Sequence, residues 1–318
     1  MIQYLTLTPD NQITEVATVD QATWLHVENP TSSEITRLSQ HYNFPQDYLT
    51  AVLDNQEISR YETPKQSELV TPLLLLLQYP HQTLSPSGFR QIQALPFSMI
   101  VTPDILITSC KEDLDFLPHI EHGQRLNSNL TNETEKITTQ LAWLFSDLFN
   151  YHLKSIRIET DRLESELQLS TENKQLFELM DMQKSLIYFN SALDQNLNVL
   201  QKVYESNLIM TSKDSLTVVF DIIIETKQAL ASVKIQTELL AQLGNIFSAI
   251  VSNNMNIVMK VLTVITIILT IPTIIGGIYG MNVALPFSND QHAFWWLLLA
   301  IGLLSLFTVW ILKKKKFF

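Results

Sequence analysis

The sequence predicts an α+β membrane protein with an N-terminal α/β domain, a long stalk helix and two transmembrane helices. Three observations lead to this fold class. The first part of the chain alternates short β-type runs and short helical segments with Pro-containing turns. The middle part keeps a helical period of apolar residues over long stretches without a strong breaker. The last part contains two uncharged stretches, each long enough to cross a bilayer.

Residues 1–128 are predicted to form the α/β domain. Leu73–Leu77 is apolar at five successive positions, which is typical of a strand covered on both faces. The sequence contains no Gly-rich phosphate loop, no nucleophile elbow and no Cys/His metal cluster, so it does not predict an enzyme. Strands are expected at 1–7, 23–29, 68–80, 93–102 and 104–109, and helices at 32–43 and 112–122.

Residues 129–256 are predicted to form a helical hairpin and the stalk. The hairpin helices are expected at about 132–168 and after Ser170-Thr171, and the stalk helix from about Asp214 into the first membrane span. A helix that long cannot bury itself in one chain, so we expect it to pack in a bundle with the hairpin or with copies of itself.

Acidic residues gather around the tip of this hairpin. A solvated acidic face is the default interpretation, and attraction of divalent cations is the alternative. The acids are Glu159, Asp161, Glu164, Glu166, Glu172, Glu178 and Asp181.

The charge of the whole chain is unevenly placed. The 318 residues carry 21 Lys+Arg and 32 Asp+Glu, and residues 1–256 hold 31 of these acids but only 16 of the basic residues. Such an acidic balance argues against a nucleic-acid surface and suits a cytosolic domain that meets cations. The single cysteine, Cys110, excludes a disulfide framework within one chain.

Residues 257–318 are predicted to form a transmembrane pore domain, with spans at about 257–280 and 293–312. Asp290, in the loop between the spans, is the only charged residue from Val261 to Leu312. The run Lys313–Lys316 follows the second span, and the positive-inside rule places it in the cytoplasm. Because two spans return the chain to its starting side, both termini are expected to be cytoplasmic.

One face of the first span is unusually polar. Its residues recur at alternating steps of three and four, the period of a left-handed helical bundle. Two interpretations stay open: a packing seam in which each threonine bonds its own helix backbone, or the wall of a water-accessible pore. Four threonines in register favour the pore. The stripe consists of Asn256, Met259, Thr263, Thr266, Thr270, Thr273, Gly277 and Gly280.

The segment "SNNMNIVMKVLT…IYGMN" (252–282), together with the second span and the terminal lysines, resembles the CorA family of magnesium transporters. Weaker similarity, through "TWLHV" and "SMIVTPDILITSCKED", covers nearly the whole chain. The resemblance implies a cytoplasmic α/β domain, a stalk helix and two membrane helices, assembled as a funnel-shaped homopentamer in the plasma (inner) membrane. The first span would line its central pore.

The resemblance also implies which residues form the site. Gly280, Met281 and Asn282 match the family's selectivity motif at the outer mouth, where ring-forming Asn282 oxygens would accept hydrogen bonds from the water shell of Mg²⁺. Met259 and Leu262 would form a hydrophobic gate. The matching pore-lining positions favour Leu262 over Thr263, and they are Asn256, Met259, Leu262, Thr266, Thr270, Thr273 and Gly277.

Two further roles follow from the resemblance. Asp290 would attract cations, although many relatives carry more acids in this loop. Asp221 matches an acid that bridges neighbouring subunits through regulatory Mg²⁺, but the position of its partner in "FPQDYLTAVLDNQE" is Ala51, and Asp54, one turn on, is the candidate substitute.

The predicted function is therefore uptake of Mg²⁺ through a divalent cation channel that cytosolic Mg²⁺ gates, with Co²⁺ or Ni²⁺ as less favoured ions. Its predicted partners are copies of itself, the lipid bilayer and divalent cations, and no nucleic acid. One alternative is a Zn²⁺ transporter of the same superfamily. The other is a membrane-anchored coiled-coil interaction protein that transports nothing.

Overall fold

The computed structural model describes residues 1–8, 13–63, 72–102, 105–112, 130, 132–167, 173–283, 286 and 292–315. Its contacts divide the chain into two compact units, residues 1–244 and residues 245–318, and each is described by itself. The division into 1–128, 129–256 and 257–318 stays a prediction.

A seven-stranded mixed sheet forms the centre of the first unit, counted over the described residues. Its strand order is β2-β1-β3-β7-β6-β5-β4. Neighbouring strands are antiparallel except β3 and β7, which pair in parallel with Trp24 opposite Leu106. The strands are β1 (Ile2–Leu7), β2 (Ile13–Glu15), β3 (Trp24–Glu28), β4 (Arg60–Glu62), β5 (Leu73–Leu84), β6 (Arg90–Val101) and β7 (Leu106–Cys110).

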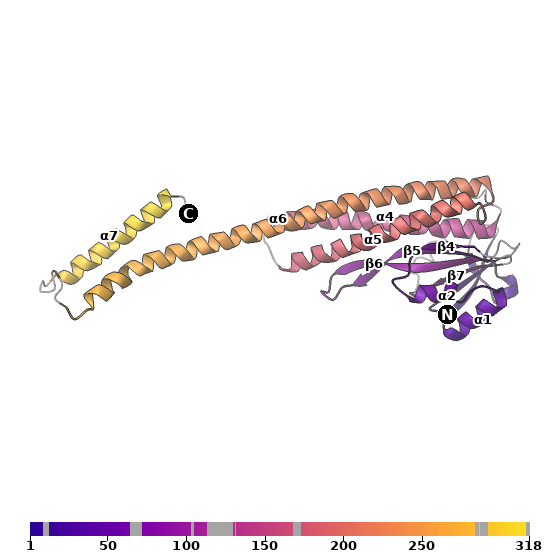
Figure 1. The fold of residues 1–318 in the computed structure, drawn as a ribbon, viewed down its shortest axis with the longest axis horizontal. Coiled ribbons are helices and arrows are strands. Elements are labelled where there is room, and N and C mark those ends of the chain that lie inside the picture. The colour runs from indigo at the N-terminus through magenta and orange to yellow at the C-terminus, as the bar shows by residue number, and fades with distance from the viewer. Residues whose placement is uncertain are drawn as a thin grey trace. The chain divides into compact units, whose positions relative to one another are not determined.

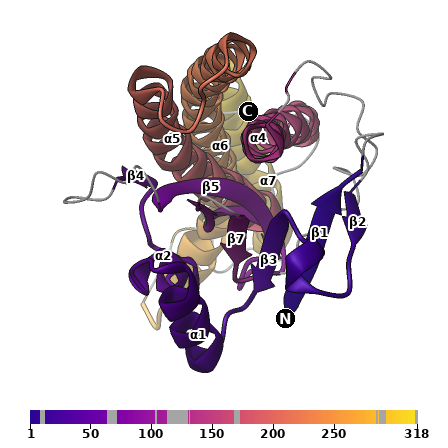
Figure 2. The ribbon, with the colours of Figure 1, turned by 90° about the vertical axis from the view of Figure 1, so that its right-hand side faces the viewer.

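Helices cover both faces of this sheet, as Figure 2 shows. The two short 3₁₀ segments are η1 (Val19–Gln21) and η2 (Ala51–Leu53). The small helices α1 (Ser32–Tyr42) and α2 (Asp47–Thr50) lie on one face, and the long helices α4 (Glu133–Leu167) and α5 (Asn173–Ser206) lie on the other. The alternation of Leu73–Leu77 explains this arrangement: Leu74 and Leu76 join the core with α1 and α2, and the odd-numbered leucines join the core with α4 and α5. All five are at most 1% exposed, so the predicted two-sided burial is confirmed.

Side-chain hydrogen bonds attach α5 to the sheet as well. Asn196 is buried, its Oδ1 accepts from the Gln78 backbone N–H at 2.9 Å, and its Nδ2 donates to the Gln78 carbonyl at 2.8 Å. The same Oδ1 accepts from the Ser59 hydroxyl at 2.8 Å. One amide therefore satisfies both backbone groups of a buried strand residue.

Helix α6 (Lys213–Tyr279) lies on α4 and α5 in the first unit and continues into the second (Figure 1). Its buried side chains within the first unit recur every three or four residues, the seam expected of a helix in a bundle. This seam consists of Val219, Ile222, Thr226, Ala229, Val233, Gln236, Leu240 and Leu243, and Ser215 and Ile223 are buried as well. The expected stalk helix and the hairpin that packs against it are confirmed.

Most of the predicted elements have close counterparts in the structure. The five expected strands correspond to β1, β3, β5, β6 and β7, and the helix expected at 32–43 corresponds to α1. The sequence does not predict β2 and β4, because three residues are too few to show an alternation. Of the helix expected at 112–122, only residue 112 lies within the described residues.

The second unit contains the end of α6 and helix α7 (Ala293–Lys314). Both helices are long and apolar enough to cross a membrane. The bounds of the two expected spans stay a prediction. Lys314 Nζ lies 5.3 Å from the centre of the Trp310 ring, a cation–π pair at the lysine-rich end of α7.

Candidate functional site: the polar face of α6

The polar stripe of α6 lies on the side of the helix that faces away from α7. Within this unit the least exposed residues of α6 are Val264, Ile268, Ile271 and Ile275, and they recur at steps of four and three. At 100° per residue these positions lie nearly opposite the threonines, so the side toward α7 is apolar and the threonine side is left open. The predicted pore-lining residues Asn256, Met259, Leu262, Thr266, Thr270, Thr273 and Gly277 are all exposed in the single chain.

Every threonine of the stripe donates its hydroxyl proton to its own helix. Thr263, Thr266, Thr270 and Thr273 donate to the carbonyls four residues earlier at 2.7–2.8 Å. These bonds are the ones that a packing seam predicts. They also leave the hydroxyl oxygen as an acceptor only, which suits a wall facing the outward-pointing hydrogens of a hydrated cation.

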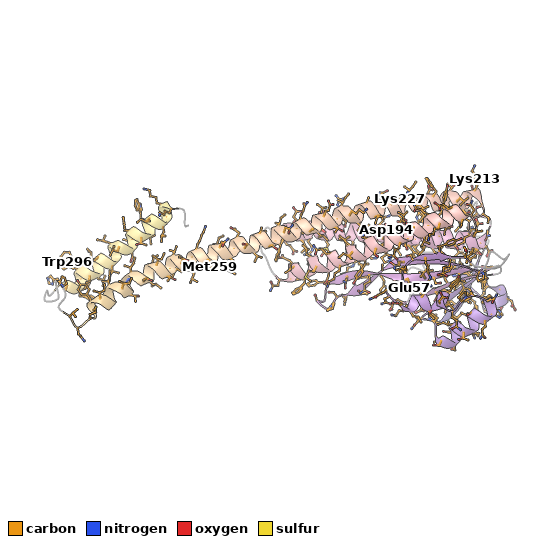
Figure 3. All side chains as sticks on the ribbon, in the orientation of Figure 1. Glu57, Asp194, Lys213, Lys227, Met259 and Trp296 are labelled. Carbon is orange, nitrogen blue, oxygen red and sulfur yellow. The ribbon has the colours of Figure 1, made fainter. Side chains whose placement is uncertain are left out.

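The two residues of the predicted hydrophobic gate are also exposed: Met259, which belongs to the stripe, is 54% exposed, and Leu262, which lies beside it, is 56% exposed. Figure 3 shows Met259 on α6 and Trp296 at the start of α7. The side chains of Met259 and Leu262 lie one turn apart and are both apolar. They therefore offer no hydrogen-bonding group to water, in contrast to the threonines that follow.

The stripe ends at Gly280, which directly follows Tyr279, the last residue of α6. The Gly280 N–H donates to the Gly276 carbonyl at 2.9 Å, and the Met281 N–H donates to the Ile278 carbonyl at 3.2 Å. A Cβ at position 280 would lie 3.2 Å from the Gly276 oxygen, so a side chain there would push against the backbone that closes the helix. Met281 and Asn282 follow directly and are exposed.

Tyr279 attaches this end of α6 to the following loop. Its hydroxyl donates to the Pro286 carbonyl at 3.3 Å. The sequence analysis misses this residue because nothing in the spacing of "IYGMNVALP" shows that a phenol reaches the loop. Asp290, the predicted cation-attracting residue, lies outside the described residues.

The predicted regulatory residues lie on separate elements of the first unit. Asp221 is exposed on α6, and Asp54 is exposed just after η2, where its Oδ1 accepts the Gln56 N–H at 2.9 Å. Ala51 is 5% exposed and packs in the core, so this position supplies neither a carboxylate nor access to one. A bridging ion would therefore depend on Asp54 in place of Ala51.

The nearby acids already have a counter-ion in the chain. Arg60 pairs with Glu57 at 2.6 Å, Glu62 at 2.8 Å and Asp47 at 3.4 Å. Within the residues that the structure describes, no group of three or more His, Cys, Asp or Glu side chains is placed to hold a metal ion.

These features define a class: a membrane protein with an α/β unit, a long helix whose second part is apolar enough to cross a membrane, and a second apolar helix. The apolar part of the long helix carries an open polar face. The CorA-like Mg²⁺ transporter protein family matches residues 19–314, and the chain belongs to this family. It is thus a divalent cation transporter rather than an enzyme, and the expected fold class and family are confirmed.

Individual relatives agree with this assignment. The cobalt/magnesium transport protein CorA of Methanocaldococcus jannaschii is 23% identical over 301 residues, which cover 92% of this chain and 90% of that protein. The complete structure of the CorA magnesium transporter from the same organism covers 100% of this chain and 98% of its own, with a TM-score of 0.76 and 20% identity.

A third comparison concerns the soluble unit. The cytoplasmic domain of ZntB from Vibrio parahaemolyticus matches with a TM-score of 0.58 and 13% identity, over 79% of this chain and 96% of that domain. At these identities the two structural comparisons show a shared fold only.

Proposed function

We propose that this protein mediates Mg²⁺ uptake across the plasma membrane, through a pore that α6 lines in a homopentamer. The observation that carries the proposal is the open polar face of α6, which lies opposite the side facing α7 and ends at Gly280-Met281-Asn282. A single helix cannot enclose a pore, so copies of the chain must bring these faces together. The relatives named as magnesium or cobalt transporters support Mg²⁺ and Co²⁺ as transported ions.

In this proposal Mg²⁺ passes the outer mouth with its water shell largely retained. Mg²⁺ releases water reluctantly, so neutral acceptors that bind its waters serve conduction better than carboxylates that bind the ion itself. The Asn282 amide oxygen supplies such an acceptor, and the threonine hydroxyls continue the series inward. Asp290 raises the local cation concentration, and Met259 and Leu262 form the dewetting gate. Both termini lie in the cytoplasm, because Lys313–Lys316 follows the second span.

Asn282→Ala tests the selection step. We expect it to abolish Mg²⁺ uptake into liposomes that hold the purified protein, because alanine removes the acceptor without adding a charge. Growth rescue of a magnesium-requiring strain gives the same answer in cells. Uptake at the wild-type rate by the variant would rule out this role for Asn282, whereas absence of uptake by both the variant and the wild type would favour the non-transporting coiled-coil anchor.

Zn²⁺ transport is the second candidate, the alternative within the same superfamily that the sequence analysis leaves open. Uptake of Mg²⁺ and Zn²⁺ is measured with and without a pH gradient. Mg²⁺ uptake that does not depend on the pH gradient supports the proposal of Mg²⁺ uptake. Zn²⁺ uptake driven by the proton gradient supports Zn²⁺ transport.

Regulation by cytosolic Mg²⁺ is proposed to act through Asp221, with Asp54 of a neighbouring copy in the role that Ala51 cannot fill. Asp221→Ala is then expected to reduce inhibition of uptake by millimolar Mg²⁺, and Asp54→Ala to do the same. Inhibition that is unchanged in both variants would show that the regulatory site lies elsewhere.

A further inference from the structure

Within the first unit, helix α6 follows a seven-residue period. Its buried seam occupies two positions of the heptad abcdefg, with Val219 at a and Ile222 at d, and it keeps to these positions as far as Leu243. Position f lies opposite the seam, and positions b and c lie on either side of f. The outward face of α6, defined as positions b, c and f of residues 213–244, therefore points away from α4 and α5.

Large apolar side chains lie on this outward face. Phe220 at b and Ile224 at f are each 48% exposed, and Ile235 at c is 60% exposed. Leu239, which lies next to c at position g, is exposed as well. A helix that is apolar on two opposite sides is typical of a helix that packs on two sides, and the first unit covers only one of them.

The charged residues of α6 in this unit are separated by sign between the two flanks of the face. The lysine flank is position b, and the acidic flank is position c with the neighbouring position g. Position b holds Lys213, Lys227 and Lys234; positions c and g hold Asp214, Asp221 and Glu225, and Glu238 lies between the flanks at f. Lys213 and Lys227 are labelled on α6 in Figure 3.

These charges have no counter-ion within the described part of the chain. The salt bridges of the described residues involve Arg60, Arg162 and Lys184, and none of them includes a charged side chain of α6. Both flanks are therefore free to meet charges of another molecule.

A second copy of this chain carries the complementary arrangement. Copies inserted into one membrane have parallel α6 helices, because each α6 continues into a membrane span. Where two parallel helices touch along the same face, position b of one meets position c of the other, so lysines meet acids; antiparallel helices would place lysines opposite lysines. With no shift along the axis, Lys213 lies about 1.5 Å in height from Asp214 of the next copy, and Lys227 about 3 Å from Glu225.

We propose that the outward face of α6 is a contact between copies, in which the lysine flank of each copy packs on the acidic flank of the next. In a ring every copy uses its two flanks toward two different neighbours, and the exposed apolar residues between the flanks are covered. The charges set the direction of this contact, and the apolar residues supply most of its buried surface. The proposal rests on the assembly of copies in the proposed function, but not on which ion passes or on transport itself.

Charge reversal tests this contact in the full-length protein in detergent micelles. Lys227→Glu places a carboxylate beside Glu225 of the next copy. It is expected to raise the protein concentration at which half of the chains are assembled about tenfold, and more at low than at high salt. The double variant with Glu225→Lys restores opposite charges and is expected to assemble as the wild type does. Lys202→Glu is the matched control, because Lys202 is an exposed lysine of α5 outside the outward face of α6, and it is expected to change nothing. Sedimentation velocity measures the assembly.

Cross-linking tests the geometry of the contact even where the assembly does not dissociate. Cys110 is buried, so cysteines introduced at positions 225 and 227 are the reactive ones. With a short bifunctional maleimide, the variant Glu225→Cys/Lys227→Cys is expected to give covalent products larger than a dimer. Each single-cysteine variant is expected to stay monomeric on a denaturing gel, because position 227 faces position 225 of the neighbour and not another position 227.

The contact is overturned by a double reversal that assembles no better than Lys227→Glu, by products that stop at the dimer, or by cross-linking of the single-cysteine variants. Assembly and cross-linking as expected, in a wild-type protein that takes up no ion, would contradict the proposed function and leave the contact in place. Uptake by the wild type together with a failed cross-link would contradict the contact alone.

Discussion

The two parts of helix α6 differ in what covers them, although the helix runs through without interruption. Between residues 219 and 243 it buries a regular seam on α4 and α5, with Ile222 0% and Leu240 0% exposed. Beyond residue 256 only Val264 is buried, and the apolar and the polar residues are exposed alike. The first part is therefore covered by its own chain, whereas the second part has little cover within the chain.

This difference separates stability from function along one helix. In the first part an apolar side chain is removed from water by folding, so its loss leaves a cavity. In the second part an apolar side chain is exposed in the single chain, so its loss changes the helix surface and not a packed core.

Truncation of one residue in each part is expected to show the largest contrast. Ile222→Ala removes a fully buried side chain and is expected to lower the free energy of unfolding by about 2–5 kcal/mol. Leu262→Ala is expected to change it by less than about 0.5 kcal/mol, as for exposed positions, while altering the closed-state leak of Mg²⁺. Urea unfolding in detergent micelles, followed by circular dichroism, measures both. Equal destabilisation by the two substitutions would contradict this contrast between the two parts of α6.

Acid is expected to affect the first unit through His26. Trp24 Nε1 donates to Thr108 Oγ1 at 2.7 Å, and His26 Nδ1 lies 2.8 Å from the same hydroxyl oxygen. Burial first of all lowers the pKa of His26 from 6.5 to about 4, so the folded state favours the neutral imidazole. Because the unfolded state binds the proton more readily, stability is complete above about pH 6.5 and falls as the pH drops toward 4, by about 2 kcal/mol at pH 5.

Urea midpoints at pH 7 and pH 5 measure this loss. His26→Gln keeps a polar group but cannot titrate, so its midpoint is expected to change less between the two pH values. A variant with the full wild-type pH dependence would assign the acid sensitivity to other groups, of which His152 is the first to test.

Sequence reasoning predicts the parts of this fold in which a pattern of residues continues over a long stretch. The two-sided burial of Leu73–Leu77, the helical period of α6 and the two apolar spans are each long enough to be seen without coordinates. Strands β2 and β4 are missed because they owe their existence to pairing with β1 and β5, which no local pattern of three residues shows.

In the candidate site, too, only the residues that recur at a regular spacing are visible in the sequence. The threonine stripe is visible as a spacing, but its position opposite the side facing α7 requires the structure. The contact of Tyr279 with Pro286 and the ion pair between Arg162 of α4 and Glu178 of α5 join residues of different segments, so the sequence shows an acidic tip and a tyrosine but not what they touch.

The central claim is that the threonine face of α6 lines a water-filled path, and cysteine accessibility tests it most directly. Cys110 is the only cysteine and is 0% exposed, so the wild type serves as an unreactive background. Cysteines are placed singly at Thr270 and Thr273, and at Ile268 and Ile271 on the opposite side, and a membrane-impermeant thiol reagent is applied to the protein in liposomes. Because thiolates form in water and not in lipid, Thr270→Cys and Thr273→Cys are expected to react at least about tenfold faster than Ile268→Cys and Ile271→Cys. Equal rates on both sides, or faster reaction at Ile268 and Ile271, would contradict a pore on this face.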